Sequence, residues 1–314
     1  MLSRTADHIY WMSRYTERAE NLARMLDVHY RMSLLSKGSS MVDRNWGAIL
    51  SINELDGDFS NRYRGETQAN VVQYMAFDPA NPSSIYSCLR AARENAHAVR
   101  GTLTSELWET INSTWLKMRD TKPEVMQDDL GGFFEWVKFR SHLSRGVSVG
   151  TMLHDEAFNF SRLGTFLERG DNTARLLDVK YHVLLPSKDE VGGAADYYQW
   201  GSLLKSLSAF EIYRKVYRDA ITPLKVAELL VLRDDMPRSM HRCMNEVYEN
   251  LKVVGNSSSR ETLRRAGELH ASLHYARIED IFEKGLHEFI NDFLARINDI
   301  ASGISNDFLV PMAA

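Results

Sequence analysis

The apolar positions near the start of the chain follow the period of an α-helix. Apolar and small side chains recur at alternating intervals of four and three residues, at Met12, Thr16, Ala19, Ala23, Leu26 and Tyr30. This spacing places side chains on one face of a helix. The pattern predicts an opening helix from about Ser3 to Leu35 that buries this stripe in the core.

The same stripe recurs near the middle of the chain, at Leu163, Leu167, Gly170, Ala174, Leu177 and Tyr181. The sequence around it also recurs, because RYTERAENLARMLDVHY from Arg14 resembles TFLERGDNTARLLDVKY from Thr165. Nine of the sixteen positions counted from Tyr15 and from Phe166 are identical. So dense a match predicts an internal duplication.

A second pair of segments supports the duplication. The segment PSSIYSCLRAAREN from Pro82 matches PRSMHRCMNEVYEN from Pro237, and a Trp-Gly pair occurs at Trp46 and again at Trp200. The shift in register between these blocks indicates insertions in loops. The sequence therefore predicts two repeats of about 150 residues, covering residues 1–150 and 151–314.

The rest of the chain also has helical patterning. Only seven prolines and eighteen glycines interrupt it, and no long run alternates with period two. We expect an all-α fold, a tandem duplication packed as a helical bundle, with five or six helices in each half.

Proline positions suggest where several helices begin. Asn81 followed by Pro82, and Thr222 followed by Pro223, have the form of an N-cap residue and a first helical residue. The first of these helices is predicted to continue to about Met118.

Composition excludes several classes of function. The net charge is −4 and no block of like charge stands out, so a nucleic-acid partner has no support. No run of eighteen apolar residues exists, and the N-terminus lacks a secretory signal. We therefore expect no membrane span and a cytoplasmic location. The two cysteines, Cys88 and Cys243, are predicted to be free thiols that pack between helices.

The face opposite the apolar stripe carries the candidate site. An ordinary solvated face would vary between repeats, whereas here an acid, an amide and a guanidinium recur at the same spacing, with a second arginine on the flank. The candidate ligand-binding or motif residues are Glu17, Arg18, Asn21, Arg24, Glu168, Arg169, Asn172 and Arg175. We call the acid, amide and guanidinium positions the polar seam.

Two interpretations of the polar seam remain open. In the structural one, Arg24 pairs with Glu20 and Asp27 of its own helix, and the charges fix how helices pack. In the functional one, the seam lines a cleft in which arginine binds a carboxylate or phosphate and glutamate holds an amine.

These segments resemble the Alpha-E family, a bacterial all-helical domain named for a Glu-Arg motif. The resemblance is carried by MLSRTADHIYWMSRYTERAENLARMLDV and FNFSRLGTFLERGDNTARLLDVKYH, and also by FRSHLSRGVSVGTMLHDE and MPRSMHRCM. It implies that Glu17, Arg18, Glu168 and Arg169 are the motif residues. It also implies a role in a bacterial peptide synthesis or modification system. In that system a circularly permuted ATP-grasp carboxylate–amine ligase, a transglutaminase-like protease and an NTN-type hydrolase are encoded nearby.

Signals for metals, cofactors and covalent catalysis are weaker. Glu94 and His97 have the Glu-x-x-His spacing of helical di-metal sites, but the duplicate position of His97 is Lys252. His270 and His274 are four residues apart, which we interpret as a helix surface or interface because no HExxH glutamate accompanies them. We predict no metal and no cofactor. No phosphate-binding loop or nucleophile motif is present.

Our first functional hypothesis is a non-catalytic accessory or scaffold protein that acts with the ATP-grasp ligase. It would present an amino-acid or peptide-like substrate through the polar seam, or dock the ligase. The alternatives are an enzyme that uses Glu17 or Glu168 as general base, and a regulatory binder of a small anionic metabolite. Whether the protein is an enzyme stays open, and so does homo-oligomer formation.

Overall fold

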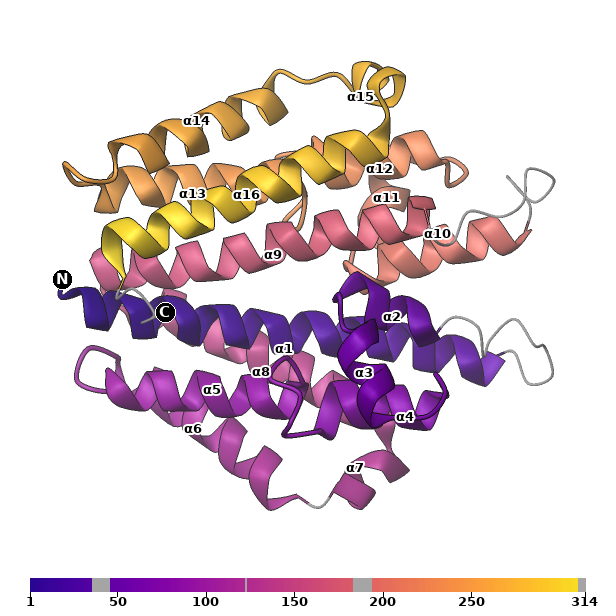
Figure 1. The fold of residues 1–314 in the computed structure, drawn as a ribbon, viewed down its shortest axis with the longest axis horizontal. Coiled ribbons are helices and arrows are strands. Elements are labelled where there is room, and N and C mark those ends of the chain that lie inside the picture. Colours follow the sequence, from indigo (N-terminus) through magenta and orange to yellow (C-terminus); the bar gives the residue numbers. More distant parts are fainter. Residues whose placement is uncertain (36–45, 122, 183–193, 310–314) are drawn as a thin grey trace. The chain divides into compact units, whose positions relative to one another are not determined.

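The computed structural model describes residues 1–35, 46–121, 123–182 and 194–309, and these residues are helical with no β-strand among them (Figure 1). The predicted all-α class is confirmed. The chain begins with α1 (Ser3–Leu35), α2 (Trp46–Ile52), α3 (Asp56–Arg62), α4 (Gln68–Val72), the π-helix η2 (Gln73–Phe77), α5 (Ile85–Ala98), α6 (Ser105–Asp120), α7 (Pro123–Asp128) and α8 (Leu130–Thr151). It continues with α9 (Glu156–His182), α10 (Ala194–Ser206), α11 (Phe210–Tyr217), α12 (Pro223–Val231), α13 (Met240–Val254), α14 (Arg260–His274), α15 (Ile278–Lys284) and α16 (Leu286–Phe308).

The chain divides into two compact units, Met1–Thr165 and Phe166–Ala314. The division falls within α9, so the first turns of that helix belong to the first unit and the remainder to the second. The units are defined by contacts within the structure, whereas the predicted repeats 1–150 and 151–314 are defined by sequence similarity. The units therefore do not test the repeats, which stay a prediction.

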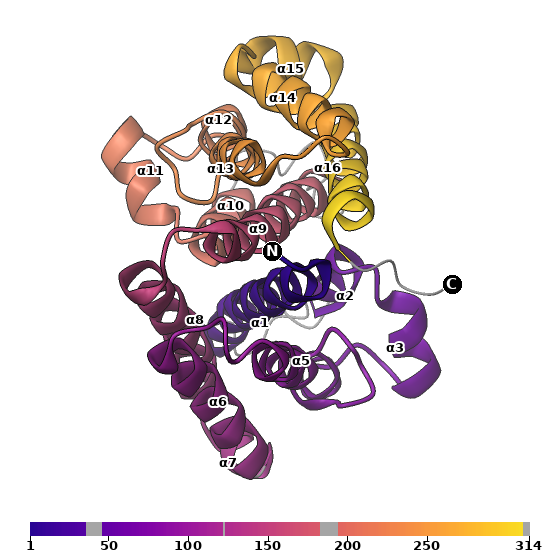
Figure 2. The ribbon, with the colours of Figure 1, turned by 90° about the vertical axis from the view of Figure 1, so that its left-hand side faces the viewer.

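The first unit is built around α1. Helices α5 and α8 both pack against α1, and α6 packs against α5 and α8, as the end-on view of Figure 2 shows. The predicted helix from Ser3 to Leu35 is confirmed. Met12, Ala19, Ala23 and Leu26 of the apolar stripe are buried as expected, whereas Thr16 and Tyr30 are partly exposed. Leu22 and Met25 on the flank are each 1 % exposed as well. Helix α1 is therefore covered on more than the one face that the stripe predicts.

The second unit contains a comparable set of packed helices. Helix α13 packs against α14, and α14 packs against α16. Helix α9 approaches α13 closely at Gly170, because a Cβ atom at this glycine would lie 3.2 Å from the Cβ of Cys243. Cys243 and Cys88 are fully buried thiols outside any disulfide, which agrees with the predicted packing role.

The helix starts are partly as predicted. Thr222 caps α12, since its side chain accepts a hydrogen bond from the Lys225 amide and Pro223 is the first helical residue. The prediction for Asn81 and Pro82 is wrong. Asn81 uses its carboxamide locally, accepting from the Ser83 amide (2.9 Å), and α5 begins three residues after Pro82, with Ser84 as its N-cap.

The stretch predicted as one helix from Pro82 to Met118 is two helices. Helix α5 ends at Ala98, and α6 starts after Thr104, which caps it by accepting from the Leu107 amide. Gly101 lies in the turn between them. Because of this break and several short helices, the described part of the first 151 residues holds eight α-helices, more than the five or six predicted. Among the described residues, no helix combines the length and the apolar character that a membrane crossing requires.

Candidate functional site

The eight predicted residues lie on α1 and α9, and most of them are withdrawn from solvent. On α1, Glu17, Asn21 and Arg24 are buried and Arg18 is partly exposed. On α9, Glu168 and Arg169 are buried, while Asn172 and Arg175 are partly exposed. Burial of this many charged side chains requires partners inside the protein.

In the first unit these partners come from α8. The Arg145 guanidinium donates to the Glu17 carboxylate (2.9 Å) and to Glu20, and the Ser141 hydroxyl donates to Glu20 (2.7 Å). Arg24 donates to Glu20 from within α1 (2.8 Å). We call these five residues the α1–α8 ion cluster. The Glu17 and Glu20 side chains are 1 % and 0 % exposed, so the cluster lies in the interior of the unit.

The polar contacts continue along the same two helices. The Asp27 carboxylate accepts from Arg31 of α1 (2.8 Å) and from Lys138 of α8 (2.7 Å). The Arg24 guanidinium also lies 3.1 Å from the Nε2 atom of His142. The predicted pairing of Arg24 with Glu20 is thus confirmed, and Asp27 has a cation from each helix.

Sequence reasoning missed the α8 side of this cluster. Lys138, Ser141 and Arg145 follow one another at spacings of three and four residues, which puts them on one helix face. That polar face, matched to the acids of the opening helix, is the signal that could have revealed them.

In the second unit the motif arginine contacts a turn and an aromatic ring. Arg169 donates to the carbonyl oxygen of Pro237 (3.5 Å), and its guanidinium lies 4.8 Å from the centre of the Phe166 ring. The Thr173 hydroxyl donates to the carbonyl of Arg238 (2.8 Å). Both acceptors stand directly before Ser239, the N-cap of α13. These contacts join α9 to the turn from which α13 starts.

Further along α9, the charges again have defined partners. Arg175 donates to Asp171 within the helix (2.8 Å), as Arg24 does to Glu20 in α1. Asp178 lies 2.6 Å from the Nδ1 atom of His287 on α16. The repeated acid therefore meets an imidazole here, where Asp27 meets Arg31 and Lys138.

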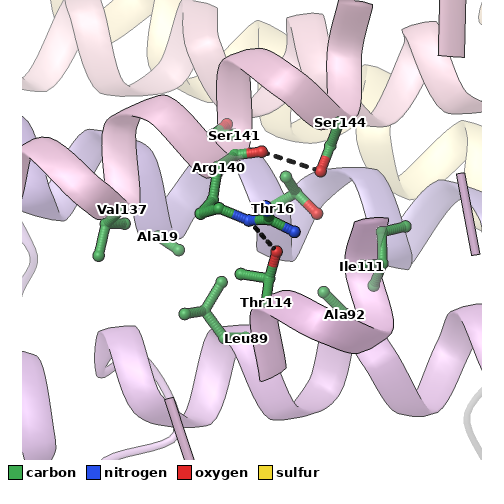
Figure 3. A pocket seen from close by; sticks show the side chains of 10 residues that line it. All are labelled: Thr16, Ala19, Leu89, Ala92, Ile111, Thr114, Val137, Arg140, Ser141 and Ser144. Carbon is green, nitrogen blue, oxygen red and sulfur yellow. Dashed lines mark hydrogen bonds between the residues drawn. The ribbon is translucent and has the colours of Figure 1, made fainter. Parts of the chain in front are cut away.

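The first unit also contains a small hollow between α1, α5, α6 and α8 (Figure 3). Arg140 enters it from α8 and donates to the Thr114 hydroxyl and to the carbonyl of Thr110, both at 2.7 Å. Burial lowers the pKa of this guanidinium. The hollow has room for about one water molecule, so it is too small for an amino acid or a peptide.

The weaker metal signals have different outcomes. The His97 ring lies 5.7 Å from Trp108, and the group of possible metal ligands among the described residues does not include it. His270 and His274 do come together with a third histidine, His241 of α13, which the sequence did not suggest. Burial and the two neighbouring imidazoles lower the pKa of His270.

Comparison with known proteins identifies relatives of this chain and its family. Three uncharacterized proteins, one from Mycobacterium bovis and two from strains of Mycobacterium tuberculosis, are each 23 % identical to this chain over 317 residues. The match covers 94 % of this chain but only 35 % of each relative, so the chain spans about a third of their length. No solved structure matches. A family model described as a predicted alpha-helical domain with a conserved ER motif matches residues 1–309, and the chain therefore belongs to the Alpha-E family.

Proposed function

We propose that this chain is a helical accessory module of a bacterial peptide synthesis or modification system, acting beside a circularly permuted ATP-grasp carboxylate–amine ligase. The observation that carries the proposal is the length of the mycobacterial relatives, in which the region like this chain makes up about a third. A helical module that is part of a longer chain is held close to the other domains of that chain and acts together with them. We expect the ATP-grasp ligase as partner both where it is a domain of the same chain and where it is a separate protein.

We also propose that the chain is a tandem duplication. The repeated Glu-Arg segments and the repeated Pro-x-Ser-x-x-x-Cys segments support it, and so do two local structures. Ser84 and Ser239 each cap a helix through the amide three residues on, and each donates to a carbonyl six residues before it. The packing order α5–α6–α8 has the same form as α13–α14–α16.

The contacts favour a scaffold role for the polar seam of the first unit. Glu17 is held by Arg145 in the interior, whereas a general base must reach the proton that it removes from a substrate. The charges of the α1–α8 ion cluster already have partners from the protein itself. The seam therefore holds α1 against α8, and docking of the ligase is favoured over presentation of a substrate through the seam.

The test is co-purification and activity of the ligase. The untagged ligase encoded beside this protein should co-purify with it, and the rate of ATP consumption by the ligase with its substrates should depend on adding this protein. A ligase that neither binds the chain nor changes its ATP consumption would contradict the proposal. Because ATP-grasp ligases consume ATP, we expect both proteins in the cytoplasm, with the transglutaminase-like protease as a further partner.

A further inference from the structure

Three histidines from two packed helices converge in the second unit. His241 lies in the first turn of α13, and His270 and His274 lie in the last two turns of α14. One nitrogen of each ring lies within 4.8 Å of the other two. We infer that His241, His270 and His274 form a binding site for a divalent transition-metal ion of the zinc class.

The buried member of the trio is oriented as a metal ligand requires. His241 is 5 % exposed, and its Nδ1 atom lies 2.8 Å from the carbonyl oxygen of Leu232. Because a carbonyl can only accept, Nδ1 carries the proton and Nε2 keeps its lone pair. An imidazole fixed through one nitrogen by a carbonyl, with the other free to bind, is the usual arrangement behind a metal-bound histidine.

The other two rings can move the short distance that binding needs. Nitrogens that share a tetrahedral zinc ion lie about 3.4 Å apart, given a Zn–N distance of about 2.0–2.1 Å. His270 is partly exposed and stacks on Tyr248 at 5.3 Å between ring centres, and His274 is exposed. Small rotations of these two side chains bring the nitrogens together while His241 stays in place.

The three ligands come from a rigid scaffold. Four residues separate His270 and His274, so both side chains lie on one face of α14, one turn apart. That face meets α13, because the His241 ring centre is 5.7 Å from that of His270 and 5.4 Å from that of His274. The side chains are thus presented by two packed helices and not by a loop.

Charged side chains of both signs lie around the trio. The carboxylates of Glu249 and Asp234 lie within electrostatic range of His270. Lys252 and Arg242 lie nearby as well, but each is paired with a carboxylate, Lys252 with Glu249 and Arg242 with Glu246.

Three histidine ligands leave one tetrahedral position for water or for an oxygen or nitrogen of a bound ligand. Imidazole nitrogens bind zinc, cobalt, nickel and copper in preference to magnesium or calcium. The inference is independent of the proposed ligase partnership, because metal binding is measured on the purified chain alone.

The experiment uses tag-free protein freed of metal, with zinc chloride and cobalt chloride as separate probes. Calorimetry should give one zinc per chain, and cobalt should show the visible absorption of a four-coordinate ion. His270→Asn and His274→Asn should each bind zinc at least about tenfold more weakly than the wild type. Zinc should raise the melting temperature of the wild type. It should leave unchanged the melting temperature of the double variant, which carries both His270→Asn and His274→Asn.

The matched control is His154→Asn, which removes an exposed histidine of the first unit that stacks on Phe158. It should bind zinc as the wild type does. Because His270 and His274 are not buried, their variants should keep the circular dichroism of the wild type in the absence of metal. A wild type that takes up no zinc, or a double variant that binds it as tightly as the wild type, would overturn the inference.

Discussion

Replacing Arg145 with methionine should strongly destabilise the first unit. In the folded protein the Arg145 guanidinium bonds to the carboxylates of Glu17 and Glu20, whose side chains are 1 % and 0 % exposed. Methionine keeps the apolar length of the side chain and removes the charge. The change therefore leaves two buried carboxylates short of one cation.

The magnitude follows from burial and from the partners that remain. Removing one member of a buried ion pair costs about 3–5 kcal/mol, because the other charge stays buried. Arg145 itself is 27 % exposed, and Glu20 keeps its bonds to Arg24 and Ser141, so we expect a loss about 1 kcal/mol smaller than that range. We expect a loss of about 2–4 kcal/mol. For a unit of this size that corresponds to about 4–16 °C in melting temperature.

Urea unfolding followed by circular dichroism measures this loss, with calorimetry to separate the transitions of the two units. The matched control is Arg31→Met on α1, the helix that carries Glu17 and Glu20. Arg31 also bonds to a buried carboxylate, that of Asp27, but its side chain is 57 % exposed and Lys138 remains beside Asp27. Because Arg31 is exposed and Asp27 keeps Lys138, we expect Arg31→Met to cost at most about 1 kcal/mol.

The comparison between the two variants distinguishes the two interpretations of the polar seam. If Arg145→Met is no less stable than Arg31→Met and yet abolishes the effect of the chain on the ligase, the cluster serves binding and our structural assignment is wrong. If Arg145→Met is the less stable by several kcal/mol and its folded fraction still supports the ligase, the cluster serves the fold.

Three further outcomes are expected. Gly164→Ala should destabilise the first unit by about 1–3 kcal/mol, because its Cβ would lie 2.3 Å from a carbonyl oxygen of α1, whereas Gly146→Ala, with open space around it, should be neutral or stabilising in thermal melts. Burial and the Asp78 carboxylate raise the pKa of Tyr63 from about 10 to about 12, so the stability contributed by the neutral phenol is complete below pH 10 and lost as pH rises toward 12. Asp78→Asn should therefore lower the pKa of Tyr63, measured by phenolate absorbance. Thr222→Ala should cost about 1 kcal/mol in urea unfolding through loss of the α12 cap.

Much of the fold could be predicted because helical periodicity is a local property. The bounds of α1 follow from its stripe alone, and the cap at Thr222 follows from a Thr-Pro pair. The start of α5 was misplaced because Asn81 has a competing use for its side chain, the turn that it forms with the Ser83 amide. Asn and Ser are both favoured as N-cap residues, so the sequence alone does not show which of Asn81 and Ser84 caps α5. The turn that Asn81 forms with Ser83 leaves Ser84 as the cap.

The composition of the candidate site was less predictable, because its residues come from helices far apart in sequence. Glu17 and Arg145 are 128 positions apart and meet only through the packing of α8 on α1. His241 likewise reaches His270 and His274 through the packing of α13 on α14. Periodicity identifies the face of each helix, but it does not say which two faces meet.

The contacts of Arg169 suggest why the Glu-Arg motif recurs. In the second unit, Arg169 and Thr173 of the repeated helix donate to the carbonyls of Pro237 and Arg238. These carbonyls belong to the Pro-x-Ser-x-x-x-Cys segment, the other sequence that recurs in the chain.

Two repeated signatures thus bind each other in the folded protein, and each constrains the other. An arginine that donates to a carbonyl just before a helix joins two elements of one unit, whatever ligand or partner the protein binds. In the second unit the motif arginine thus connects α9 to the start of α13. Chemistry particular to this chain is better sought at groups found in only one half, such as the three histidines of α13 and α14.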